Sequence, residues 1–261
     1  MIGVIATQHV VLRDEVPARP VWLSAGQARR LDPLARWAAS AADGALTSSG
    51  VVLPADTALA VGTAYGSVVS TQRLLDGIAN DGDELASPSA FSASVLSHIA
   101  GAIGEVLGVH GPVATISQGR TSALAALRWA WLQLAAGRAS TALVIAADHH
   151  TPLIAHMVGG LITCPWPLVS GASAWILQNN AGREMRLGFH PADYVIDGGA
   201  PDPRDEHCLT RACVGRIRLS VPDFLTGWYP TAVLAQPLPA AAVQLLECDR
   251  QRTIAVWCGP R

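Results

Sequence analysis

The segment Ile116-Ser117-Gln118-Gly119-Arg120-Thr121-Ser122-Ala123 leads from an apolar run directly into an alanine-rich one. Upstream, VATI (113–116) predicts a short buried strand, and downstream, TSALAALRWAWLQLAA (121–136) predicts a helix with a broad apolar face. A turn from a strand into a helix favours a nucleophile, because the backbone N–H groups and the helix dipole lower the pKa of a thiol there. The tip of this turn holds Arg120 instead, and a guanidinium acts neither as a nucleophile nor as a base.

Strand and helix patterns alternate on both sides of this turn. The strand-like ALAVGTAY (58–65), VATIS (113–117) and TALVIAAD (141–148) alternate with helix-like segments. The helix-like segments are SVVSTQRLLDGIA (67–79), SASVLSHIAGAIGEVLG (92–108) and the segment after the turn. This alternation predicts an α/β fold in which helices cover the faces of a sheet.

The two ends of the chain show weaker strand and helix periodicity. We expect a first strand from Met1, a helix over about 32–46 and a small-residue strand at Ser170–Gln178. After Gly182, the strand-like MRLGFH and TIAVW are separated by a segment rich in Pro, Asp and Gly. We therefore predict one domain over residues 1–181 and a shortened C-terminal portion over residues 182–261 that packs on the same core.

Three further motifs occur in order around the turn. They are GTAYGS (62–67), SPSAFSASV (87–95) and Gly111-Pro112 directly before VATIS. Together they resemble the N-terminal half of a β-ketoacyl synthase, over about Leu59–Leu153. The resemblance implies an α/β, thiolase-like fold with a well-matched first half and a second half that is truncated or remodelled.

The resemblance also identifies what is missing from the turn. In β-ketoacyl synthases a Cys followed by Thr-Ser lies there, so matching Thr121-Ser122 places Arg120 on the Cys position. If a gap is allowed, Gln118 takes that position, and chain-length factors, the inactive partners of ketosynthases, often carry Gln there. Neither register supplies a Cys. We therefore interpret Gln118, Gly119, Arg120, Thr121 and Ser122 as a degenerate active-site position and expect no catalytic residue.

The finer resemblance is to the chain-length-factor-type subunit of aryl polyene and xanthomonadin-like pathways. RRLDPLAR (29–36) before an alanine-rich helix, the SPSAFSASV loop and VIAAD (144–148) carry it. It implies a non-catalytic subunit that forms a heterodimer with an active ketosynthase, works with an acyl carrier protein and uses no cofactor. The residues that it implies at the partner interface and acyl tunnel are Ser87, Pro88, Phe91 and Val95.

Other residues that a working synthase needs are also missing. All 18 cationic residues are Arg, so the buried lysine of many ketosynthase sites has no counterpart. The two histidine motifs of the second half are absent, and His190 and His207 lack the expected neighbours. Without the nucleophile, the lysine and the histidine motifs, this chain alone has no route to condensation.

Two other functions stay open from the residues. An independent thiolase-fold acyltransferase or hydrolase would use Ser117, Ser122 or Cys164 as its nucleophile, with His98 or His149 as a base. Serines near helix starts are usually caps, however. A homodimeric acyl-binding scaffold would need no ketosynthase at all.

Arg120 also allows two interpretations. In the first, it pairs with a carboxylate such as Asp148 or Glu105 and closes a dead site, because an unpaired buried cation is costly. In the second, it points into a partner's tunnel or meets the anionic phosphopantetheine of an acyl carrier protein.

Histidines and cysteines do not predict a metal site. The spacing of His149-His150 and His156, and that of His207-Cys208 and Cys213, match no zinc signature well. We expect five free thiols, because the start of the chain carries no export signal. The cysteines are Cys164, Cys208, Cys213, Cys248 and Cys258.

Composition excludes two classes of partner. A net charge of −2 and a pI near 6.4 give no basic field for nucleic acid. The mean hydropathy of +0.31 is high, yet no apolar run approaches the roughly 20 residues of a membrane span. A large buried interface would explain the excess, and we expect a cytoplasmic protein.

Overall fold

The computed structural model describes residues 2–11, 19–119, 121–159 and 170–179 and five later strands. Arg120 and the segments between those later strands lie outside the described residues. For most of the first strand and for the later strands, the backbone alone is described. The prediction of a domain boundary at 181/182 stays a prediction.

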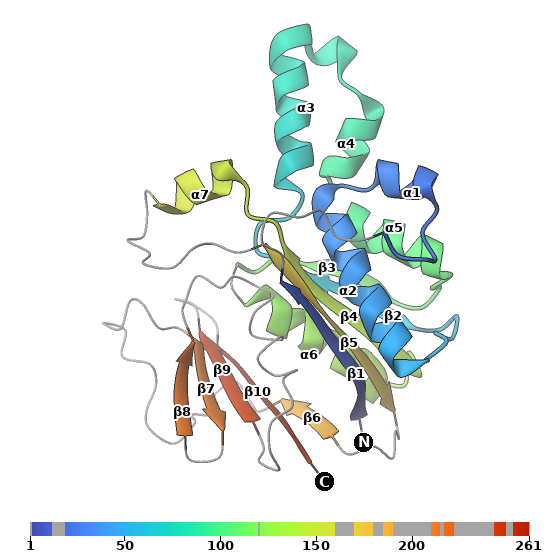
Figure 1. Cartoon of the computed structure of the whole chain (residues 1–261), viewed down its shortest axis with the longest axis vertical. Coiled ribbons are helices and arrows are strands. Elements are labelled where there is room, and N and C mark those ends of the chain that lie inside the picture. Colours follow the sequence, from blue (N-terminus) through green and yellow to red (C-terminus); the bar gives the residue numbers. More distant parts are fainter. Residues whose placement is uncertain are drawn as a thin grey trace.

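The described strands form one ten-stranded sheet, in the order β3-β2-β4-β5-β1-β6-β10-β9-β7-β8 (Figure 1). The strands are β1 (Ile2–Val11), β2 (Ala58–Gly62), β3 (Val113–Ile116), β4 (Thr141–Asp148), β5 (Gly171–Asn179), β6 (Met185–Phe189), β7 (Thr210–Val214), β8 (Ile217–Val221), β9 (Val243–Cys248) and β10 (Thr253–Pro260). β2 is parallel to both β3 and β4, and β5 is antiparallel to β4 and β1. Every residue of β2 and β4 is buried, as expected for parallel strands covered on both faces.

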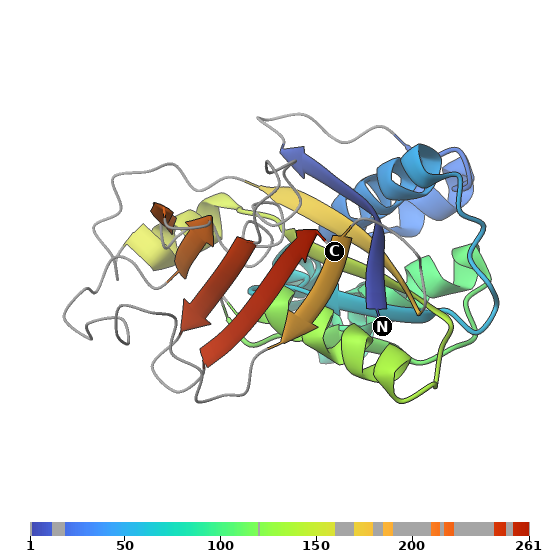
Figure 2. The same cartoon turned by 90° about the horizontal axis from the view of Figure 1, so that it is seen from below.

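Alternate residues of the central strands point to two separate cores. One face packs on α2 (Pro33–Ser49) and α5 (Ser97–Leu107), and the other packs on α6 (Ser122–Ala135). Figure 2 shows these helices on opposite sides of the sheet. The side chains that β2 and β4 give to the α2/α5 core are Leu59, Val61, Leu143, Ile145 and Ala147. Those that they give to the α6 core are Ala58, Ala60, Ala142 and Val144.

The helix starts follow from local capping. Before α1 (Ala25–Arg30), the Ser24 and Gln27 side chains form a reciprocal capping box. Before α2, the Asp32 carboxylate accepts the Leu34 N–H at 2.8 Å, and Pro33 fills the first helical position. α7 (Pro152–Gly159) begins with Pro in the same way.

A helical arm projects from this body at the top of Figure 1. It consists of α3 (Val68–Asp81), a short 3-10 turn, η1 (Asp83–Leu85), and α4 (Pro88–Ser94). No residue from Thr71 to Ser97 is buried. The arm therefore contributes almost nothing to either core.

Two predictions about single elements are wrong. Val113–Ile116 is not a buried strand, because β3 lies at the edge of the sheet, and Val113 is 45% exposed there. The helix predicted over 92–108 is instead two helices, α4 and α5. Ser87 and Pro88 start α4 earlier than expected, and Val95 has an extended conformation that ends it. In the described part of the chain, no single helix is long and apolar enough to cross a membrane, and α4 with α5 qualifies only as a pair bent by 96°.

Close packing between β2 and the start of α6 requires a glycine. A Cβ atom on Gly62 would lie 2.5 Å from the Ser122 carbonyl oxygen and 3.1 Å from the Ala123 Cα. Both neighbours are backbone atoms in a buried layer, so neither can move aside as a flexible side chain would.

We expect Gly62→Ala to lower the free energy of unfolding by about 1–3 kcal/mol, because the added methyl group overpacks the β2–α6 contact. Gly77→Ala is the matched control, since its Cβ would meet nothing within 4 Å on α3. The control should be stabilised by roughly 0.5–1 kcal/mol, because Ala is the better helix former. Urea unfolding of both variants measures the difference, and equal effects would contradict the proposed close contact.

Candidate functional site

The carboxyl ends of β2, β3 and β4 bring three loops together at one edge of the sheet. The Thr63 N–H donates to the Ile116 carbonyl at 3.0 Å, joining the loops after β2 and β3. The loop after β4 joins them through Asp148, whose carboxylate oxygen Oδ1 lies 2.9 Å from the Thr63 hydroxyl. Open α/β sheets bind ligands at such carboxyl ends, so this edge is the candidate site.

The turn between β3 and α6 is held by its own hydroxyl groups. The Ser122 hydroxyl accepts the Gln118 N–H at 2.8 Å and donates to the Gly119 carbonyl. The Thr121 hydroxyl donates to the Gln118 carbonyl at 2.9 Å. Gly119 has a φ of 58°, which lets the chain reverse there without a Cβ penalty. Thr121 and Ser122 are both buried, so their hydroxyls act as local braces of the turn.

Ser117 lies differently from these two residues. It is exposed, and its hydroxyl points to the Ala64 carbonyl at a long 3.5 Å. In the described part of the chain, neither Ser117 nor Ser122 bonds to a histidine. The sequence prediction of a Ser nucleophile with His98 or His149 as its base therefore gains no geometric support, because such a pair needs a direct hydrogen bond.

Asp148 is the most perturbed acid of the site. Its side chain is fully buried, and Oδ1 also accepts the N–H groups of Ala64 (2.7 Å) and Tyr65 (3.3 Å). Its second oxygen, Oδ2, has no hydrogen-bond partner among the described residues. Burial raises the pKa of Asp148 to about 7, although the hydrogen bonds to Ala64, Thr63 and Tyr65 act in the opposite direction.

Two histidines follow Asp148, and the pKa of each is lowered. His149 lies 6.4 Å from the Trp37 ring, and His150 meets the Tyr65 ring edge-on at 5.5 Å. Burial lowers the pKa of His149, with a smaller opposing effect of Asp32. Burial, and then the neighbouring His149, lowers the pKa of His150 to about 4. Burial therefore favours the neutral imidazole of both residues.

The predicted site residues fall into two groups. Gln118, Gly119, Thr121 and Ser122 lie together in the turn at the sheet edge, whereas Ser87, Pro88, Phe91 and Val95 lie on the arm or at its end. Arg120 lies outside the described residues, so both interpretations of it stay predictions. Of its two suggested carboxylate partners, Asp148 is buried in the site and Glu105 is exposed on α5.

Sequence reasoning missed the linking role of Thr63 and Asp148. The signal was present, since Asp148 ends an apolar strand and Thr63 begins the GTAYGS turn after another. The described residues include no group of three or more His, Cys, Asp or Glu residues that could hold a metal ion. Cys164 and His207-Cys208 lie outside those residues.

Comparison with known proteins identifies the family. Residues 5–159 match the model of the β-ketoacyl synthase N-terminal domain. No curated protein matches the sequence. The chain belongs to the β-ketoacyl synthase N-terminal domain family, and the predicted thiolase-like α/β fold of its first half is confirmed.

Several solved structures share this fold at low sequence identity. The ishigamide ketosynthase/chain length factor has a TM-score of 0.60 at 18% identity, over 74% of this chain and 68% of that one. The ketosynthase ApeO in complex with its chain length factor ApeC, from Xenorhabdus doucetiae, has a TM-score of 0.54 at 19% identity, over 74% and 84%. The AntDE:AntF complex, a type II polyketide synthase acyl carrier protein with its ketosynthase, has a TM-score of 0.61 at 15% identity, over 73% and 69%.

We expect Asp148→Asn to gain stability relative to the wild type as pH rises from about 4 to about 7. The folded-state pKa of about 7 lies above the ordinary value of 3.8, so in this window the carboxyl ionises in the unfolded chain but stays protonated in the folded one, and the wild type loses stability as pH rises. Asn keeps an acceptor for Thr63 and Ala64 but carries no proton to lose. The difference in unfolding free energy should grow by up to about 1.4 kcal/mol per pH unit in this window. Urea unfolding at a series of pH values measures it, and a pH-independent difference would contradict a protonated Asp148.

His150→Gln should show the opposite trend. The pKa of His150 is lowered to about 4 from 6.5, so the wild type gains stability as pH rises through this window. Relative to the wild type, the variant should therefore be most stable near pH 4 and lose that advantage by about pH 6.5. The same pH series tests it, and a difference that rises with pH would show that His150 is charged in the folded protein.

Proposed function

We propose that this protein is a non-catalytic, chain-length-factor-type subunit that forms a heterodimer with an active β-ketoacyl synthase. The observation that carries the proposal is the turn at 117–122. It lacks a cysteine in either register, and its two buried hydroxyls are occupied in bracing the turn. A condensing site without a nucleophile at the helix start has no acyl-enzyme to form.

The edge strand β3 supports a protein partner. In the described part of the chain it pairs with β2 alone, which leaves the N–H and C=O groups of its outer side without a strand. Its sequence is the apolar VATI, and all four residues are at least partly exposed. An edge strand without Pro or charge leaves its outer backbone groups available for pairing with another chain.

The arm supports the same conclusion from a different surface. Its exposed apolar side chains include Leu75 (58%), Leu85 (74%) and Phe91 (62%), and Val95 and Leu96 follow at its end (both 44%). Helices gain most of their stability by packing an apolar face, and this arm has little on the body to pack against. A partner that covers these side chains would supply the missing burial.

In this proposal the two subunits divide the work. The partner supplies the active-site cysteine, the lysine and the two histidine motifs that this sequence lacks. This chain supplies interface surface and one wall of the tunnel that receives the growing acyl chain. The pair carries out decarboxylative condensation of malonyl units held on an acyl carrier protein, in polyketide or polyene synthesis. Two of the similar structures, a ketosynthase with its chain length factor and a ketosynthase with its acyl carrier protein, support this division.

The first test is co-expression with a candidate ketosynthase from the same gene neighbourhood, with the affinity tag on this chain. We expect a stoichiometric heterodimer on size-exclusion chromatography and condensation activity that requires both chains. A well-behaved homodimer that ignores the ketosynthase would favour the acyl-binding scaffold instead. Thioester hydrolysis or acyl transfer by the chain alone, lost in Ser117→Ala, would favour the independent enzyme.

Phe91→Arg should weaken the heterodimer by tenfold or more, because a buried aromatic side chain is a typical hot spot and Arg would bring an unpaired charge into its place. Leu132→Arg is the matched control, since Leu132 is a 46% exposed apolar residue on α6, away from the arm. Both variants should keep the thermal unfolding midpoint of the wild-type chain. Equal retention of the partner by the two variants in the tagged pull-down would contradict an arm-mediated interface.

A further inference from the structure

The arm joins the body through two short segments that meet each other. It leaves β2 through residues 63–67, here called the arm turn, and it returns at Val95 and Leu96 before α5 (Figure 1). Gly66 has a φ of 66°, and a Cβ atom there would lie 2.7 Å from Cδ2 of Leu96. A change of backbone conformation in the arm turn would therefore move the whole arm.

One carboxyl group ties the arm turn to the sheet. Oδ1 of Asp148 accepts the Thr63 hydroxyl and the N–H groups of Ala64 and Tyr65. The Thr63 hydroxyl in turn accepts the Gly66 N–H at 3.0 Å. Four consecutive residues of the arm turn are thus linked to Asp148, three of them directly and Gly66 through Thr63.

The other oxygen of this carboxyl, Oδ2, is buried without a hydrogen-bond partner among the described residues. The Asp148 side chain is fully buried, and a buried carboxylate without a counterion is costly. Burial raises the pKa of Asp148 to about 7, and the opposing effects come from its hydrogen bonds. The geometry therefore fits a carboxyl that carries its proton on Oδ2 and uses Oδ1 as the acceptor.

The ionisable side chains around Asp148 do not act as its counterion. In the described part of the elements packed around it, they are Tyr65 of the arm turn, His149 and His150 after β4, and Asp32 and Arg36 at the start of α2. None of these side chains bonds to the Asp148 carboxyl oxygens. β5 places the uncharged Gly171 opposite Asp148, and α6 begins with Ser122. Burial lowers the pKa of His149 and that of His150, the latter to about 4, so neither supplies a positive charge near neutral pH.

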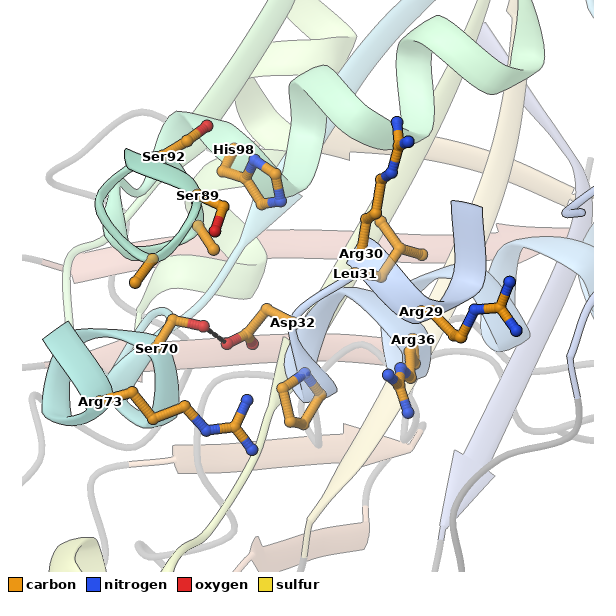
Figure 3. Close-up of a pocket in the computed structure, with 13 residues that line it drawn as sticks. Arg29, Arg30, Leu31, Asp32, Arg36, Ser70, Arg73, Ser89, Ser92 and His98 are labelled. Atoms are coloured by element: carbon orange, nitrogen blue, oxygen red, sulfur yellow. Dashed lines mark hydrogen bonds between the residues drawn. The ribbon is translucent and has the colours of Figure 1, made fainter. Parts of the chain in front are cut away.

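Few other contacts would oppose opening of the arm turn. The Ser70 hydroxyl of α3 donates to Asp32, beside a cavity of about 560 Å³ between the arm and the body (Figure 3). The arginines that line this cavity are Arg29, Arg30, Arg36 and Arg73. No residue from Thr71 to Ser97 is buried. Segments with so little buried surface open at a low cost in free energy, without unfolding of the sheet.

We propose that Asp148 is a proton-dependent latch of the arm. With its proton, Asp148 holds the arm turn against the end of β4. Loss of the proton favours an open state, in which the arm turn separates from the sheet and water reaches the carboxylate. The inference does not rest on the proposed heterodimer, since it concerns a motion of the single chain.

The closed and open states bind the proton with different affinity, and this sets the direction of the effect. In the closed state the pKa of Asp148 is about 7, whereas a hydrated carboxyl in the open state has its ordinary value of 3.8. Below about pH 4 both states are protonated, and the arm turn stays closed. Between about pH 4 and about pH 7 only the open state loses the proton, so the opening equilibrium constant rises by up to about tenfold per pH unit. Above about pH 7 both states are ionised, and the constant levels off.

The test is native-state hydrogen–deuterium exchange of the full chain, read by mass spectrometry from about pH 5 to about pH 8 and corrected for the intrinsic exchange rate. We expect the protection of residues 63–67 to fall by up to about tenfold per pH unit up to about pH 7 and then to level off. Low urea should change this exchange little, because opening of one turn exposes little surface. Amides of β4, which exchange through global unfolding, should respond strongly to urea.

Asp148→Asn should remove the pH dependence, because an amide keeps the acceptor oxygen but has no proton to lose. Thr63→Val should increase exchange of the arm turn severalfold at every pH and keep the pH dependence, because it removes one tie and leaves the acid. Asp56→Asn is the matched control. Asp56 is an exposed acid at the opposite end of the sheet that accepts the Ser140 N–H and hydroxyl, and its variant should keep the wild-type profile.

Three results would overturn the proposal. The first is a flat pH profile in the wild type, which needs no variant and would show that Asp148 is ionised in the closed state, as a pairing with Arg120 would make it. The second is a pH dependence that persists in Asp148→Asn, which would assign it to another group such as Asp32. The third is a urea response of the arm turn equal to that of β4, which would show that the arm turn opens only when the whole chain unfolds.

Discussion

The buried carboxyl group of Asp148 ties the central sheet to the segment that leads into the arm. It lies at the end of the fully buried strand β4, yet its hydrogen bonds go to Thr63, Ala64 and Tyr65, which follow β2. Those residues lead directly into α3 and the arm, and the Thr63 N–H also ties them to the end of β3. One acid thus sets the geometry of three loops. A protonated carboxyl can do this at low cost, because it avoids burying a charge without a counterion.

The sequence predicted the body of the protein well and its periphery poorly, for physical reasons. In the region of 58–148, the spacing of apolar residues reflects which faces of the strands and helices are buried. That spacing is visible in the sequence, so these elements could be predicted. The edge position of β3 was not predictable in this way, since a VATI segment has the same residue pattern whether the strand lies in the centre or at the edge of a sheet. Ser87-Pro88 signalled the start of α4, but the apolar periodicity continues through the break at Val95 and did not reveal it.

The sequence predicted which segment forms the candidate site but not which hydrogen bonds its residues make. Ser122 follows a strand in a way that suits either a nucleophile or a brace, and only the distances to Gln118 and Gly119 distinguish the two. A cavity between the arm and the body was only partly visible in the sequence, since three of the four arginines that line it lie in the RRLDPLAR motif. Its residues are scattered over 29–98, in five helices, and no local motif connects Arg29 with Arg73.

The arm has two faces with different chemistry, and this difference bears on how a partner would find it. Ser70 and Arg73 of α3, and Ser89 and Ser92 of α4, face the charged cavity, while Leu75 and Phe91 are exposed apolar residues. The arm has no buried residue from Thr71 onward, so the contacts across the cavity are the main ones available to fix its orientation. A partner that covers the exposed apolar side chains would therefore also fix the orientation of the arm, and ordering it costs conformational entropy.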